Sequence, residues 1–184
     1  MRLIIRMMFI ALLCACPSVS MAEKSIAMTL LPGIGIPVGG HWGGTYSTSF
    51  YLGAESEIRW TKNLATGGMA GYFYGHSDGN ALKKEFKNLQ LMPYVKYYRA
   101  LGEKYTFYGV MGAGVYFVNY DDDAATPDID DSTKRYFGYM TGLGISRKLA
   151  ADFHLGIDCR LHQIFRQNFT ITTLTPSLLA RVDF

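Results

Sequence analysis

The last fifteen residues of the chain, 170–184, read TITTLTPSLLARVDF and alternate between two kinds of side chain. Counting back from Phe184, the alternate positions are Val182, Ala180, Leu178, Pro176 and Leu174. The positions between them are mostly polar and include an arginine and an aspartate. Because successive side chains of a β-strand point to opposite faces, this period of two predicts a strand with one apolar face and one mostly polar face.

The same alternation recurs along the chain and predicts seven further strands. In one segment, Phe50 and Ile58 fall on one face, whereas Glu55, Glu57 and Arg59 fall on the other. The expected strands are 25–36, 47–60, 64–76, 88–100, 105–120, 136–149, 153–166 and 170–184. Each is near or above the ~9–11 residues that a tilted strand needs to cross the hydrocarbon of a membrane.

Some details of these strands are less well defined by the pattern. The segments 64–76 and 105–120 are apolar on both faces, so the alternation does not orient them. Pro93 and Pro176 fall inside two strands. Because proline has no backbone N–H to donate, we expect bulges or strand ends at both positions.

The connections between the expected strands alternate in length. Three of them, at 61–63, 101–104 and 150–152, are tight turns. Three others are long, namely 37–46, 77–87 and 121–135, and the remaining one at 167–169 is short. Short turns at one end and longer loops at the other are typical of antiparallel barrels in outer membranes. An even number of strands places both termini at the end with the tight turns.

The amino terminus has the three parts of a secretory signal peptide. Arg2 and Arg6 are basic, 7–15 is apolar, and Ser20-Met21-Ala22 is a small-x-small cleavage site. This pattern predicts a signal peptide at 1–22 and a single domain at 23–184. An alternative is lipoprotein processing, in which Cys16 would carry the lipid.

The composition agrees with a barrel that crosses a membrane. Only 18% of the residues are charged. Without Arg2 and Arg6 of the signal peptide, 16 basic residues face 15 acidic ones, and this nearly neutral charge argues against a nucleic-acid partner. The mean hydropathy is +0.06. This middling value is expected where apolar residues facing lipid alternate with polar residues facing the interior. After removal of the signal peptide, Cys159 is the only cysteine, so we expect no intramolecular disulfide.

Several segments resemble the small outer-membrane β-barrel family that includes OmpA-like transmembrane domains and OmpX/Ail-type proteins. They are PYVKYY at 93–98, YGVMGAGVY at 108–116, GLGI at 142–145 and the final strand. The resemblance covers the chain beyond the signal peptide. It implies an all-β, eight-stranded, antiparallel up-and-down transmembrane β-barrel in the bacterial outer membrane.

The resemblance also implies partners. The final strand is similar to the signal that barrel-assembly machinery reads, with Leu178, Ala180, Val182 and Phe184 on one face. Outer-membrane lipid and lipopolysaccharide would surround the barrel, which we expect to be a monomer without a cofactor.

Electrostatics predict which face of each strand points inward. A charge that faces lipid at the membrane midplane costs ~2–4 kcal/mol, so the charged faces should line the interior. The expected polar network of the lumen is Glu55, Glu57, Arg59, Lys96, Asp158, Arg160 and Arg181. A soluble barrel of lipocalin type would instead turn its apolar faces inward. The mixed acids and bases on several polar faces favour the membrane barrel.

Candidate sites of chemistry are few. His76-Ser77-Asp78 is a catalytic-looking cluster, but neighbouring strand residues point to opposite faces, which works against His76 meeting Ser77. The loop 121–135 is rich in aspartates, whose carboxylates could hold Ca²⁺ or Mg²⁺. The spacing of these aspartates does not match that of an EF-hand loop. We expect both segments to be polar connections, and we expect no catalytic, cofactor or metal site.

These observations favour a non-enzymatic outer-membrane barrel with a structural or surface-interaction role of adhesion or resistance type. Two alternatives stay open: an enzyme that modifies lipid A, of deacylase or acyltransferase type, and a narrow channel. A soluble ligand carrier is a further alternative that the membrane location would exclude.

Overall fold

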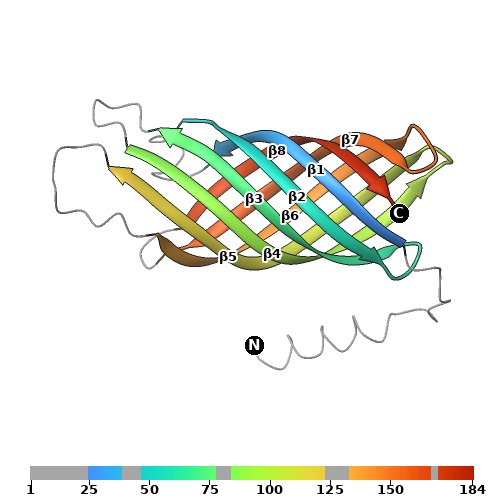
Figure 1. Cartoon of the computed structure of the whole chain (residues 1–184), viewed down its shortest axis with the longest axis horizontal. Coiled ribbons are helices and arrows are strands. Elements are labelled where there is room, and N and C mark those ends of the chain that lie inside the picture. Colours follow the sequence, from blue (N-terminus) through green and yellow to red (C-terminus); the bar gives the residue numbers. More distant parts are fainter. Residues whose placement is uncertain (1–24, 39–46, 78–83, 123–132, 167–169) are drawn as a thin grey trace, which may run out of the picture.

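The structure is a computed structural model that describes residues 25–38, 47–77, 84–122, 133–166 and 170–184. Eight antiparallel strands close into a barrel in sequence order (Figure 1). They are β1 (Ser25–Pro37), β2 (Ser49–Arg59), β3 (Leu64–Ser77), β4 (Lys84–Leu101), β5 (Tyr105–Asp122), β6 (Lys134–Lys148), β7 (Phe153–Phe165) and β8 (Thr170–Asp183). The predicted fold class is confirmed. Within these ranges, no helix is long and apolar enough to cross a membrane.

Closure of the sheet pairs the first strand with the last, since β1 lies antiparallel to β8. Following the paired residues from Ala27 through all eight strands leads back to β1 at Pro37, ten positions further along. Such an offset requires the strands to tilt relative to the barrel axis, as Figure 1 shows. A barrel of eight strands is narrow, so side chains can fill its interior.

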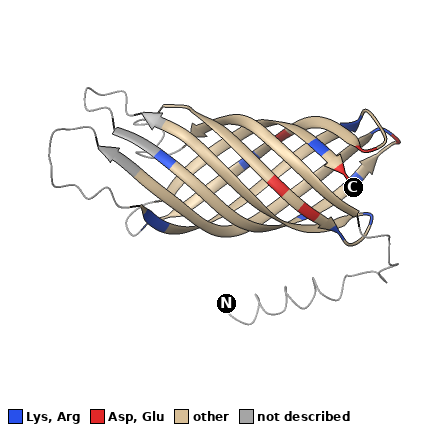
Figure 2. Cartoon of the chain, viewed as in Figure 1, with Lys and Arg blue, Asp and Glu red and all other residues tan. Residues whose placement is uncertain are grey.

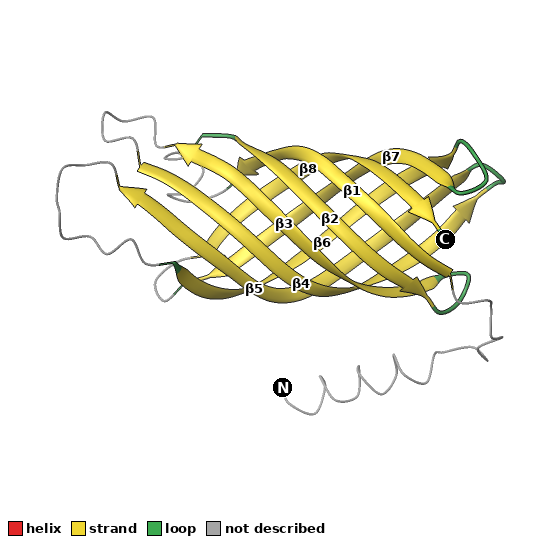
Figure 3. Ribbon diagram, in the orientation of Figure 1, coloured by secondary structure: helices red, strands yellow, loops and turns green. Residues whose placement is uncertain are grey.

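The three tight turns lie together at one end of the barrel, which we call the turn end (Figure 3). Backbone hydrogen bonds close two of them, from Trp60 N to Leu64 O and from Leu149 N to Phe153 O, each at 2.9 Å. The turn between β4 and β5 uses Gly102, whose φ of 73° suits glycine. Phe184 N donates to Ile26 O at 2.8 Å, so the first and last strands also meet at this end.

The strand β4 begins earlier than the alternation predicted. It starts at Lys84 rather than at residue 88, and there it pairs with the end of β5 at Asp122. The added residues are mostly polar and do not alternate, so a hydropathy pattern cannot include them. Backbone pairing with a long neighbouring strand extends β4 beyond its patterned part.

The expectation of bulges or strand ends at the two prolines is wrong. Pro93 pairs with Gly68 of β3, and Pro176 pairs with Cys159 of β7, without a register shift at either site. The backbone N–H of a strand residue points to one neighbouring strand only, so a proline removes a single bond and the other ladder continues. A register shift does occur in β3 after Phe73, where Gly75 has a φ of 64°.

The described barrel is apolar outside and partly polar inside. Side chains such as Leu178 and Met111, which are 66% and 65% exposed, point outward. Figure 2 shows that most of each strand is uncharged and that basic and acidic positions both occur at the turn end. The interior holds aromatic and aliphatic side chains together with buried charges such as Lys96 and Arg160. This arrangement reverses the polarity of a soluble protein.

Candidate functional site

The charged side chains of the lumen come from four strands. Because residues two apart on a strand share a face, β2 points Glu55 and Glu57 inward together, and β7 does the same with Asp158 and Arg160. Lys96 of β4 and Arg181 of β8 complete the set that ion pairs connect. We call these six residues and Asp183 the lumen network.

Arg160 is the centre of the lumen network. Its Nε donates to Asp158 Oδ1 at 2.7 Å, and its Nη1 donates to Glu55 Oε1 at 2.5 Å. The same Nη1 lies 3.3 Å from the sulfur of Met69 and 3.5 Å from that of Met140. The guanidinium is fully buried, so each of these contacts replaces hydration that the charge has lost.

Lys96 joins the two acids of β2. Its ammonium lies 2.5 Å from Glu55 Oε2 and 3.3 Å from Glu57 Oε2. Tyr94, two residues away on the same strand, and Tyr108 of the neighbouring β5 each have their ring centroid 5.0 Å from Nζ. Cation–π contacts of this kind are strongest where water is excluded, as it is here.

Arg181 continues the lumen network towards the turn end. Its Nη1 lies 2.6 Å from Glu57 Oε1, and its Nε lies 2.6 Å from Asp183 Oδ1. Asp183 Oδ2 in turn lies 3.2 Å from His154 Nε2. Tyr98 donates to Glu57 at 2.7 Å and accepts from Arg181 at 2.5 Å. The chain of contacts therefore runs from Asp158 in the middle of the lumen to its mouth at the turn end.

The seven residues predicted for the lumen all belong to this region, but they do not all play the same part. Arg59 contacts a ring, with its guanidinium carbon 4.5 Å from the centroid of Tyr98. With Asp183 included, four acids face four bases: Glu55, Glu57, Asp158 and Asp183 against Arg59, Lys96, Arg160 and Arg181. Equal numbers of opposite charges let the interior be neutral without bound counter-ions.

The tyrosines that contact the lumen network are missing from the sequence prediction. Tyr108 donates to Asp158 Oδ2 at 2.5 Å, and Tyr98 bridges Glu57 and Arg181. Tyr94 and Tyr98 are each two residues from Lys96, so the alternation places all three on the polar face of β4. This spacing could have identified both tyrosines as lumen residues. For Tyr108 no such signal existed, because β5 is apolar on both faces.

Towards the end of the barrel opposite the turn end, the lumen is lined by aromatic and amide side chains. Gln90 Nε2 donates to the hydroxyl of Tyr51 at 3.0 Å, and the hydroxyl of Tyr116 lies 3.2 Å from His162 Nδ1. The rings of His162 and Phe73 are nearly perpendicular, with centroids 5.4 Å apart. His162 and His154 thus lie in separate environments. Among the described residues, no three His, Cys, Asp or Glu side chains gather as a metal ion would need.

Other predicted features cannot be placed. The signal peptide at 1–22, with Cys16, lies outside the described residues, as does most of the acidic loop. Asp78 also lies outside them, and for His76 and Ser77 only the backbone, at the end of β3, is described.

The outer face carries the residues predicted to contact lipid. On β8, Leu178 and Val182 are exposed, Pro176 and Ala180 are half-buried, and Phe184 is exposed at 73%. Cys159 is also exposed on this face. Six aromatic side chains also reach the outer surface: Trp60, Tyr72, Tyr74, Tyr97, Tyr105 and Tyr139.

Comparison with solved structures shows which fold this is. Neisserial surface protein A superimposes with a TM-score of 0.62 and 14% identity, over 89% of this chain and 98% of its own. Ail, the attachment invasion locus protein of Yersinia pestis, gives 0.59 and 12%, over 89% and 100%. The chain has the fold of the small outer-membrane barrels of OmpA and OmpX/Ail type.

The same fold also carries an enzyme. The outer-membrane enzyme PagL superimposes with a TM-score of 0.51 and 15% identity, over 85% of this chain and 98% of its own. No protein-family model matches the sequence, and no curated protein matches it closely. At these identities the comparisons define the fold of the small barrel.

Proposed function

We propose that this chain is an integral barrel of the bacterial outer membrane with a structural or surface-interaction role. The observation that carries this proposal is the reversed polarity of the barrel. Large apolar side chains cover the outside, whereas Arg160 and Lys96 are 0% and 1% exposed. In water this arrangement would expose an apolar belt far larger than soluble monomers tolerate. In a membrane it is the favourable arrangement, because closed strands pair every backbone group.

The lumen network supports a structural role over a conducting one. Arg160 and Lys96 reach across the interior to acids on β2, so the ion pairs occupy the space that a channel would need. Opening a path would break buried pairs, and removing one partner of such a pair costs ~3–5 kcal/mol. We therefore assign the lumen the task of holding the barrel closed.

Surface interaction, in this proposal, belongs to the long connections between β1 and β2, between β3 and β4, and between β5 and β6. Ail, named for attachment and invasion, shares the fold, which supports such a role here. The final strand presents Leu178, Val182 and Phe184 outward, as a segment read by barrel-assembly machinery would. Lipopolysaccharide would be the neighbour of these connections.

Two measurements on the same cells test this role. The first compares adhesion to epithelial cells of bacteria that produce the wild-type barrel or a variant with 123–132 replaced by a short Gly-Ser turn, which keeps the paired residues of β5 and β6. The proposal expects lower adhesion for the variant at equal outer-membrane level, and equal adhesion would contradict it. The second is mass spectrometry of lipid A with and without the protein. A mass change that disappears in His76→Ala would show an enzyme instead.

A further inference from the structure

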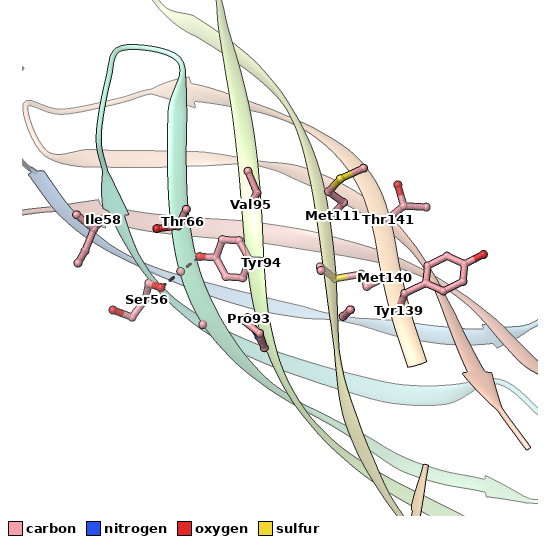
Figure 4. Close-up of a pocket in the computed structure, with 14 residues that line it drawn as sticks. Ser56, Ile58, Thr66, Pro93, Tyr94, Val95, Met111, Tyr139, Met140 and Thr141 are labelled. Carbon is pink, nitrogen blue, oxygen red and sulfur yellow. Dashed lines mark hydrogen bonds between the residues drawn. The ribbon is translucent and has the colours of Figure 1, made fainter. Parts of the chain in front are cut away.

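A groove crosses the outer face of the barrel, over β2 to β6, with a volume of about 1020 Å³. Small or flat residues that follow one another from strand to strand form its floor. Ser56 of β2 pairs with Gly68 of β3, and Gly68 pairs with Pro93 of β4. Ala113 of β5 lies one strand further on and pairs with Tyr139 of β6. Together these residues span four gaps between strands, which is roughly 19 Å. Figure 4 shows Tyr139 at the far end of this groove.

A continuous ridge borders the groove on the side of the turn end. Ile58, Thr66, Val95, Met111 and Thr141 are paired in succession across the five strands. Met111 is 65% exposed and Val95 is 42% exposed, so both stand well above the floor (Figure 4). On the opposite side the next row of the register holds Leu91 and Val115. Neighbouring rows on one face are ~7 Å apart, so the floor is one row wide.

Gly68 makes the floor deep, and the fold itself does not require glycine there. A Cβ built on Gly68 meets nothing within 4 Å, and the backbone does not have a positive φ. A glycine inside a strand costs stability, because it adds backbone freedom and no packing. Its neighbour Gly67 differs, since a Cβ there would overlap Ser56 O and the hydroxyl of Tyr94. Gly68 therefore keeps an open space on the outer face.

The end of the groove on β2 and β3 lies close to basic residues of the turn end. Ser56 and Thr66 lie beside the tight turn of β2 and β3, where Trp60 Nε1 donates to Thr66 Oγ1 at 2.7 Å and Lys62 is exposed. Exposed charges at the turn end are mainly positive: Lys62, Arg99, Lys104, Arg147 and Lys148 against Glu103 and Asp152 (Figure 2). Such basic residues attract the phosphates of anionic lipids.

We propose that this groove binds one acyl chain of an anionic phospholipid from the leaflet at the turn end, with the lipid phosphate near Lys62. The inference rests on the proposed membrane location. A flexible chain can follow an oblique groove one row wide, whereas a second barrel is convex and cannot enter it. Because neighbouring lipid tails are as apolar as the groove, close packing and the charged headgroup provide the preference.

Native mass spectrometry of the detergent-folded barrel tests the proposal, with added phosphatidylglycerol as the probe. Gly68→Phe fills the groove, and Gly109→Phe is the matched control. Gly109 also faces outward, across the ridge, and a Cβ there meets only Leu143 Cδ2 at 3.7 Å. We expect one retained lipid per wild-type barrel, occupancy about tenfold weaker in Gly68→Phe, and no change in Gly109→Phe.

A second comparison tests the headgroup. Lys62→Gln should weaken retention of phosphatidylglycerol and leave that of phosphatidylcholine with the same chains unchanged. Equal retention by Gly68→Phe and wild type would overturn the proposal, and so would a dimer mass that Gly68→Phe removes. Both glycine variants are first checked for a heat-dependent shift in electrophoretic mobility. A missing shift in the wild type itself would instead refute the membrane barrel, so the two failures are distinguishable.

Discussion

Arg160 of β7 reaches across the lumen to Glu55 of β2, and its Nη1 lies 2.5 Å from Glu55 Oε1 with both side chains fully buried. Lys96 binds the other oxygen of the same carboxylate at 2.5 Å. One carboxylate of β2 thus compensates two buried cations, one from β4 and one from β7. Its loss would leave both cations short of a partner where water cannot replace it.

Glu55→Gln should therefore destabilise the barrel strongly. We expect the free energy of unfolding to fall by ~3–5 kcal/mol, because each cation keeps its burial and loses its closest anion. The measurement is urea unfolding in lipid vesicles, followed by tryptophan fluorescence. Glu103→Gln, in the exposed turn between β4 and β5, is the control and should change stability by less than ~0.5 kcal/mol. Equal effects of the two substitutions would show that the pair with Arg160 is not structural.

Removing the central cation should open the lumen. We expect wild-type barrels in planar bilayers to show little conductance, and Arg160→Ala barrels to show discrete steps, because the guanidinium fills the middle of the narrow interior. Arg147→Ala, on the exposed turn end, is the control that should leave conductance unchanged. Large steps in the wild type would favour the narrow channel over the closed barrel.

The inward glycines should resist substitution where outward ones do not. In Gly144→Ala the new methyl group would overlap the ring of Tyr108, which donates to Asp158. We expect a loss of ~1–3 kcal/mol from overpacking. Gly68→Ala meets nothing within 4 Å and should be neutral or stabilising. The same urea titration measures both, and a tolerated Gly144→Ala would mean that Tyr108 does not occupy the position described here.

Cys159 reports which face of β7 meets lipid. It is exposed on the outer face, so a bilayer should shield it from water. We expect a charged, membrane-impermeant maleimide to label the thiol in unfolded protein and to leave it unlabelled in vesicles. Rapid labelling in vesicles would place this face in water and would contradict the orientation of β7. The variant Ala151→Cys,Cys159→Ser, with its thiol in an exposed turn, is the control that should be labelled in detergent micelles.

Sequence alternation was sufficient for β2 and β7 because one face of each carries charges. On β2, Glu55 and Glu57 define the inner face, and on β7 Asp158 and Arg160 do the same. For β3 and β5 the inner positions are partly glycines such as Gly71 and Gly112. These glycines make room for large side chains of neighbouring strands, since a Cβ on Gly71 would overlap the amide of Gln90. Hydropathy cannot detect that relationship, because the partner lies on another strand.

The pairing within the lumen was also beyond a sequence prediction. The charge pattern indicated which residues share the interior, but which acid meets which base depends on the register of strands far apart in sequence. Glu55 meets Arg160 across 105 positions of the chain. Asp183 was overlooked because it stands beside the chain end, where exposure is the usual expectation. The prediction of bulges or strand ends at the two prolines was wrong because the effect of a proline depends on which neighbouring strand its missing N–H would have faced.

The central claim is that this chain forms a closed barrel in the outer membrane, and electrophoretic mobility tests it most directly. Outer-membrane fractions are run in detergent with and without boiling, and the band is located by immunoblot. A closed barrel resists unfolding in detergent without heat, so the unboiled protein should migrate differently from the boiled protein. A single unshifted band recovered in the soluble fraction would contradict the account, because the apolar outer face could not then be exposed.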